Sequence, residues 1–148
     1  MNHFIEHELV QKLLQADFVA GLLEVNTDRR EHPESRVCDF LEQQGSYIKY
    51  GMIERRQYMD LVGAYASSIW QALKPVVALR RAAPNSSAMY ENFEYVASLD
   101  LRRRRADTRR EAPLATLLPE DEWRAVAADY VAAAGVDARE AKPLLHPR

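Results

Sequence analysis

The sequence predicts an all-α protein, a bundle of four to five helices around a long central helix kinked by a proline. Glycine is scarce, with 5 among 148 residues, and apolar residues recur three and four positions apart along most of the chain. Sustained alternation of apolar and polar residues, the mark of a half-buried strand, does not occur. Hydrophobic residues make up 47% of the chain, which is enough to fill the core of one domain of this length.

The first predicted helix covers about residues 3–26 and carries two apolar stripes. One stripe includes Leu9 and Leu13, and the other consists of Val10, Leu14, Phe18, Leu22 and Val25. A helix that is apolar on two sides is either enclosed by the core or shared with a second chain. We expect burial in the core and keep a homodimer as the alternative.

The second predicted helix runs from Pro33 to about Tyr50. Proline loses no hydrogen bond in a first helical turn, and the acid Glu34 complements the helix dipole there. Gly51 is placed to end the helix in a left-handed turn. Cys38 projects off the main apolar stripe, which consists of Val37, Phe40, Leu41, Tyr47 and Ile48.

The third predicted helix, about residues 54–81, is the central one. Pro75 should kink or divide it, because proline cannot donate to the carbonyl of Gln71. One face of this helix is apolar and is expected to form the spine of the core; it consists of Tyr58, Leu61, Val62, Tyr65, Ile69, Leu73, Val76 and Leu79.

Two further helices complete the predicted bundle. The first follows a turn at residues 83–87 and completes a helical core domain, residues 1–101. Its extension frays into an arginine-rich linker, residues 102–118. The last helix, residues 119–135, begins with Pro119, ends at Gly135 and packs on the core, and residues 136–148 form a tail.

Four short segments between Val37 and Leu99 occur in an order that carries a family resemblance. The segments are Asp39–Glu42, Tyr50–Ile53, Trp70 with Leu73–Val77 and Arg80, and Tyr90–Tyr95. In this order they resemble an uncharacterised family of small all-helical bacterial proteins, classed as a domain of unknown function. The resemblance implies a helical architecture and brings no established reaction.

The first residues contain a candidate metal motif, because His3, Glu6 and His7 satisfy the pattern H-x-x-E-H. In zinc proteases with this pattern a helix presents two imidazoles on one face and a glutamate as base. Further ligands would have to come from Glu31, Glu34 or His32. The motif lies at the frayed start of a short chain without an obvious third ligand, so we expect no metal and keep a metal-dependent hydrolase that uses His3 and His7 as the least favoured alternative.

An arginine cluster is the candidate contact with an anionic partner; it consists of Arg102, Arg103, Arg104, Arg105, Arg109 and Arg110. Arginines so concentrated create a local positive potential that suits nucleic acid, an anionic membrane surface or an acidic protein. No aromatic residue stands between them to stack on a base. Side chains that are solvated or paired within the chain are the alternative interpretation.

Arg80 projects onto the apolar side of the central helix near its end. A guanidinium there needs a carboxylate or free carbonyl groups, and at the floor of a pocket it would hold an anionic ligand. Glu42, Glu91, Glu94 and Asp100 are expected to be helix-surface acids or counter-ions for Arg80 rather than a catalytic pair.

Composition narrows the class of function. Twenty basic and 22 acidic residues give a net charge of -2, which excludes attraction of the whole molecule to nucleic acid. The single cysteine, the missing export signal and the missing apolar span favour a cytoplasmic protein, at most peripheral to a membrane. The sequence therefore predicts a non-enzymatic interaction module without a cofactor, with self-association as one form of interaction and an arginine-driven anion binder as the alternative.

Overall fold

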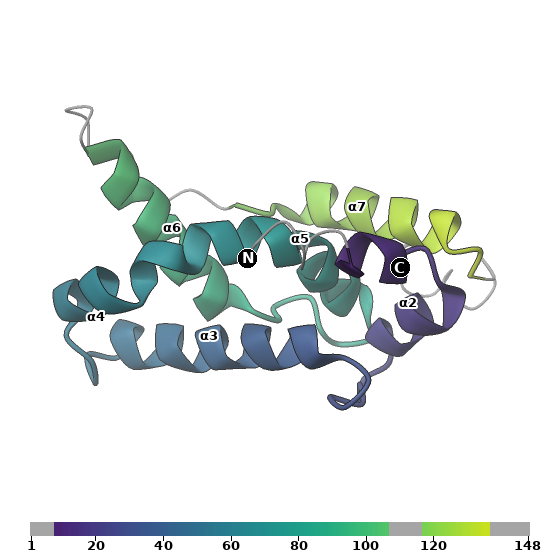
Figure 1. The fold of residues 1–148 in the computed structure, drawn as a ribbon, viewed down its shortest axis with the longest axis horizontal. Helices are drawn as coiled ribbons and strands as arrows, with labels where there is room; N and C mark the ends of the chain where they lie inside the picture. Colours follow the sequence, from purple (N-terminus) through teal and green to yellow (C-terminus); the bar gives the residue numbers. More distant parts are fainter. Residues whose placement is uncertain (1–7, 107–116, 137–148) are drawn as a thin grey trace. The chain divides into compact units, whose positions relative to one another are not determined.

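The computed structural model describes residues 8–106 and 117–136, and these ranges are helical without any strand (Figure 1). The all-α prediction is confirmed. Residues 8–12 are helical, and the elements that follow are α2 (Ala16–Leu22), α3 (Pro33–Lys49), α4 (Arg55–Leu61), the 3-10 helix η1 (Gly63–Tyr65), α5 (Ala66–Ala82), α6 (Glu91–Ala106) and α7 (Glu120–Ala133).

The first predicted helix is divided by a turn at residues 13–15, where Gln15 has an extended backbone. The turn shifts the helical phase, so the projection onto one continuous helix was wrong. Phe18 and Leu22 are buried together with Leu9 and Leu13, whereas Val10, Leu14 and Val25 are exposed. The second predicted stripe therefore does not form one core face.

The long central helix is also divided, at residues 62–65 rather than at Pro75. Val62 leaves helical geometry with φ of -121°, and it precedes Gly63, a weak helix former. α5 continues through Pro75. The prediction that Leu61, Val62 and Tyr65 belong to the core spine was wrong, because the break exposes 77% of Leu61, 41% of Val62 and 67% of Tyr65.

Two glycines end helices as predicted. Gly51 and Gly135 have φ of 73° and 69°, in the left-handed region that glycine adopts without strain. The amide of Gly51 donates to Ile48 and that of Met52 to Tyr47, and the amides of Gly135 and Val136 repeat this pattern on α7. Both ends are Schellman motifs. After the Schellman motif at Gly51, the chain reverses direction between α3 and α4 (Figure 1).

The buried face of α3 lies to one side of the predicted stripe. Cys38 is fully buried, while Val37 and Phe40 are exposed, so their predicted places were wrong. The cause is a close approach at Gly45, where a Cβ atom would lie 2.2 Å from the carbonyl oxygen of Asn92, at the start of α6. The side of α3 that carries Gly45 therefore packs against α6.

The described residues form two compact units. The first unit comprises residues 8–35, 74–89 and 118–136, and in it α2 contacts α7 and Lys74 pairs with Glu122 at 2.5 Å. The second unit comprises residues 36–73, 90–106 and 117. Trp70 meets Phe93 edge to face there, with ring centroids 5.0 Å apart. A further buried cluster of the second unit contains Ile48, Tyr58, Met59, Ala66, Val96 and Leu99.

Among the described residues, no helix combines the length and the hydropathy that crossing a bilayer requires.

Candidate functional site

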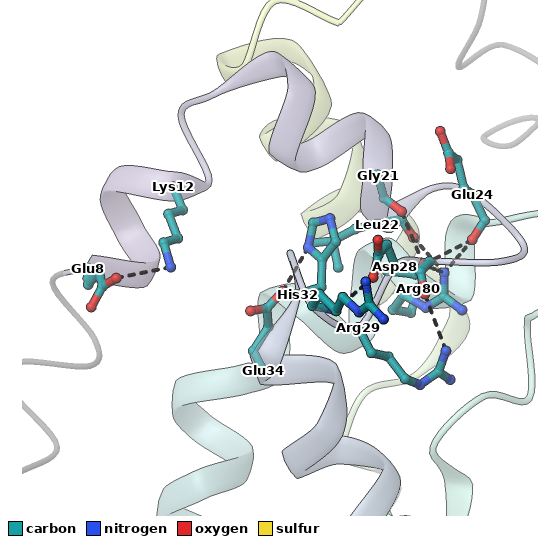
Figure 2. A network of polar contacts seen from close by, with 12 residues as sticks. Glu8, Lys12, Gly21, Leu22, Glu24, Asp28, Arg29, His32, Glu34 and Arg80 are labelled. Carbon is teal, nitrogen blue, oxygen red and sulfur yellow. Dashed lines mark hydrogen bonds and ion pairs between the residues drawn. The ribbon is translucent and has the colours of Figure 1, made fainter.

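Arg80 is a fully buried cation of the first unit, with 1% of its surface exposed. Its Nη1 donates to the backbone carbonyls of Leu22, at 3.1 Å, and Glu24, and to the hydroxyl of Thr27 (Figure 2). Of the two kinds of partner expected for Arg80, free carbonyl groups are the kind found. Leu22 is the last residue of α2, so the guanidinium stabilises the negative end of this helix.

Thr27 completes the environment of Arg80. Its hydroxyl donates to the carbonyls of Gly21, at 3.1 Å, and Glu24, at 3.2 Å, while it accepts from Arg80. The Nε atom of Arg80 is buried and has no hydrogen-bond partner among the described residues. The loop after α2 therefore encloses the guanidinium and satisfies its charge with dipoles.

His32 and Glu34 form a second buried polar pair in the first unit, with Nδ1 and Oε1 2.9 Å apart (Figure 2). The imidazole lies against Phe18, with ring centroids 4.7 Å apart. Gly21 leaves room for the ring, since a Cβ atom there would lie 2.5 Å from Nε2. These contacts fix the ring as part of the core at the start of α3.

The candidate metal motif lies outside the described residues, because His3, Glu6 and His7 precede residue 8. Glu8, which follows it, pairs with Lys12 at 3.0 Å (Figure 2). The described part of the chain contains no group of three or more His, Cys, Asp or Glu residues that could hold a metal ion.

Glu42 belongs to the second unit and caps the start of α6. One carboxylate oxygen accepts from the backbone amides of Asn92 and Phe93, both at 2.9 Å, and the other from the Asn92 side chain at 2.8 Å. The first amides of a helix have no partner inside the helix. The Glu42 carboxylate, which comes from α3, therefore accepts from the first amides of α6, as an N-cap side chain usually does for its own helix.

Asp39, which lies one turn before Glu42 on α3, also bonds to the chain at the start of α6. Tyr90, directly before α6, has φ of 65°, which is uncommon for an aromatic residue. Its hydroxyl donates to Asp39 at 3.2 Å. Asp39 and Glu42 together fix an unfavourable backbone conformation at the start of α6.

Asp100 caps α5 in the same way and is 1% exposed. Its Oδ2 accepts from the amide of Ser67 at 3.0 Å and from the Ser67 hydroxyl at 2.5 Å. Its Oδ1 accepts from Arg104 Nε at 3.1 Å. Glu42 and Asp100 were expected to be surface acids or counter-ions for Arg80, and the structure instead places them at helix N-termini.

The described part of the arginine cluster is the last turn of α6. Arg103 pairs with Asp60 at 2.9 Å, and Arg104 donates to the carbonyl of Ala64 as well as to Asp100. Pairing within the chain, one of the two interpretations of the cluster, thus holds for these two side chains. Arg109 and Arg110 lie outside the described residues.

A solvent-facing apolar group adjoins these arginines. Asp60, the partner of Arg103, directly precedes Leu61, and Ala64, the partner of Arg104, directly precedes Tyr65. We call this group the α4 edge and define it by Leu61, Val62, Tyr65, Arg103, Arg104 and Arg105. Ten large hydrophobic residues of the described chain are exposed, and the stretch from Tyr50 to Tyr65 holds half of them, so exposure of apolar side chains is concentrated here.

Two groups in the second unit have shifted pKa values. Glu54, the N-cap of α4, accepts from the amides of Gln57, at 2.7 Å, and Arg56, at 3.0 Å, and these hydrogen bonds lower its pKa below the usual 4.5. Burial raises the pKa of the Tyr58 hydroxyl, which has no hydrogen-bond partner among the described residues. Neither shift brings together an acid and a base that could act on a substrate.

Comparison with known proteins adds no relative: no family model, no curated protein and no solved structure matches the chain. The resemblance over Val37 to Leu99 stays a prediction.

Sequence reasoning missed the helix caps at Glu42 and Asp100. A capping side chain is expected within the few residues before its helix, whereas Glu42 lies 50 residues before Asn92 and Asp100 lies 33 residues after Ser67. One available signal was that neither α5 nor α6 begins with a well-placed capping residue of its own, as Tyr65 and Tyr90 show.

Proposed function

We propose that the protein is a non-enzymatic interaction module and that the α4 edge is its binding surface. The observation that carries the proposal is the exposure of Leu61 and Tyr65, at 77% and 67%, beside the arginines of α6. Apolar side chains that gather on a surface rimmed by polar groups are typical of a site of macromolecular contact.

The polar residues that could have served catalysis have structural partners, which supports the same proposal. Glu42 and Asp100 accept from amides at helix ends, Arg80 donates to carbonyl groups, and His32 bonds to Glu34. A general acid or base must be able to reach a substrate proton. Groups whose polar atoms are already hydrogen-bonded within the protein are poorly placed for that role.

Site-specific photocrosslinking in the native host tests the proposal. Benzoylphenylalanine replaces Leu61 or Tyr65 in separate variants, and the control variant carries it at Asp129, an exposed position on α7. We expect an adduct from positions 61 and 65 and none from position 129. Equal yields at all three positions, or none at any, would contradict a binding surface at the α4 edge.

A homodimer is one occupant of this surface that the same variants detect, as an adduct of twice the mass of the chain. Light scattering across a dilution series gives the independent measure. A molar mass that falls from two chains to one on dilution would support self-association, and a mass of one chain at every concentration would exclude it.

A further inference from the structure

The α4 edge combines two chemical characters within one short segment. Leu61 and Tyr65 extend into solvent as an aliphatic and an amphipathic aromatic side chain. Arg103, Arg104 and Arg105 occupy the adjoining last turn of α6, and the first two contact residues 60 and 64. Tyrosine with a polar hydroxyl, aliphatic side chains and arginine are the residues that proteins place at the boundary between water and lipid.

The same combination recurs at the other end of α4. Tyr50 and Met52, in the turn before this helix, are 75% and 73% exposed. Lys49, Arg55 and Arg56 are exposed beside them in the sequence. α4 has 7 residues, so its two ends are only about 10 Å apart at 1.5 Å per residue.

Among the residues that the structure describes, few acidic ones lie near the α4 edge. Asp100 is buried under Ser67 and Arg104, and the Glu54 carboxylate accepts from two amides of its own helix. Asp60 pairs with Arg103, but both side chains are about half exposed, at 56% and 49%. Exposed ion pairs of this kind contribute little to stability, so Arg103 can exchange Asp60 for a phosphate group at small cost.

We infer that the partner of the α4 edge is the surface of a bilayer that contains anionic lipids. The inference rests on the proposed function and adds the chemical class of the partner. Arg103 and Arg105 would bind headgroup phosphates, while Leu61 and Tyr65 would enter the layer between headgroups and acyl chains. Neither contribution alone gives stable attachment, and the two together do.

The positive charge of the arginines would equally suit a nucleic acid, but the exposed apolar residues of the α4 edge favour a bilayer as the partner. Phosphate backbones are bound by cations and sequence-tolerant stacking by aromatic rings, so exposed Leu61, Val62 and Met52 add nothing to such a site. These aliphatic side chains make the free energy of binding more favourable only where they leave water, as they do in the interfacial layer of a membrane.

Flotation of the full-length protein with vesicles tests the inference. One preparation is phosphatidylcholine alone, and the other contains about a third phosphatidylglycerol. We expect flotation with the anionic vesicles, little with the neutral ones, and a decrease at high salt. In Arg103→Ser/Arg105→Ser the partition coefficient should fall about 25-fold, because each basic side chain contributes about fivefold at an anionic surface. Leu61→Ser/Tyr65→Ser should lower it about tenfold.

Two control variants remove the same residue types elsewhere. Arg30→Ser/Arg36→Ser removes two exposed arginines, and Val10→Ser/Leu14→Ser removes two exposed apolar side chains. Both should float like the unaltered protein, and a thermal melt should show every variant folded. Arg104 is left in place because it bonds to Asp100 and Ala64.

Three outcomes would overturn the inference. They are no flotation with anionic vesicles, equal losses in the control variants, and retention on DNA that depends on Arg103 and Arg105 but not on Leu61 and Tyr65. A protein adduct at position 61 or 65 in the crosslinking experiment, without any vesicle binding, would leave the proposed interaction module intact and refute only the lipid partner.

Discussion

Arg80 in the first unit and Glu42 in the second apply the same electrostatic rule with opposite charge. Arg80 places a cation on carbonyl oxygens at the end of α2, and Glu42 places an anion on amides at the start of α6. Each charge complements the helix dipole and satisfies groups that the helix itself leaves unpaired.

The two contacts differ in how completely they are satisfied. Both carboxylate oxygens of Glu42 accept hydrogen bonds, and the side chain is only partly buried. Arg80 is fully buried and bonds through Nη1, while its Nε has no partner in the part of the chain that the structure describes. A buried donor with an unmade bond is costly, so the net contribution of Arg80 to stability comes from what its other bonds hold in place.

Replacing Arg80 tests the more buried of the two contacts and should have the largest effect. Arg80→Met keeps much of the volume but removes the guanidinium donor from the carbonyls of Leu22 and Glu24, of which the second keeps only its bond from Thr27. We expect a loss of about 3 kcal/mol in the free energy of unfolding, measured with urea. A variant within about 0.5 kcal/mol of the unaltered protein would show that these bonds contribute no net stability.

Replacing Glu42 tests the cap of α6. Glu42→Ala should lower the free energy of unfolding by about 2 kcal/mol, since two helix amides and the Asn92 side chain lose a charged acceptor. Gln43→Ala, on the same turn of α3, removes only an exposed hydrogen bond to Tyr47 and should cost about 0.3 kcal/mol. Equal losses in the two variants would remove the special role of Glu42.

The two Schellman glycines provide a smaller effect that should be equal in the two units. Nothing lies within 4 Å of a Cβ atom at Gly51 or Gly135, so alanine there changes only the backbone energy. Each substitution should cost about 1 kcal/mol, measured as the shift in the urea midpoint at constant slope. A near-zero cost at one glycine only would show that its turn does not persist in solution.

The local cap at Glu54 gives the smallest effect, and one that depends on pH. Because the folded protein lowers the pKa of Glu54, folding favours the charged carboxylate, and this contribution is present above pH 4.5 and lost as the pH falls below it. Glu54→Gln should therefore be less stable than the unaltered protein at neutral pH and should match it in acid. A difference in stability between the two proteins that stays constant with pH would contradict a stabilising role for the charged Glu54 carboxylate.

Local chemistry was predictable from the sequence, and long-range contacts were not. The helix starts at Pro33 and Pro119 and the stops at Gly51 and Gly135 depend on a few neighbouring residues, and all four appear in the structure close to the predicted positions. The buried residues of the last helix recur three and four positions apart, as expected of a helix that packs on the core, and they are Trp123, Ala127, Val131 and Ala134.

The errors arose where one helix was projected across a break or where a distant element decided the outcome. Gly63 indicated that the central helix could be interrupted, but the apolar residues on both sides of it recur with helical spacing and favoured one continuous helix. The buried face of α3 depends on the approach of α6 to Gly45, which no periodicity reveals. For the candidate site, the arginines were found from their concentration in a short stretch of sequence, but the apolar half of the α4 edge was assigned to the core.

Amide hydrogen exchange of Glu42→Gln, compared with the unaltered protein, tests most directly whether charged side chains from other helices hold these helix ends. The substitution keeps the shape of the side chain and removes the charge. We predict faster exchange at the amides of Asn92 and Phe93, with unchanged exchange at Ser67, which Asp100 caps independently. Unchanged protection of Asn92 and Phe93 would contradict this account.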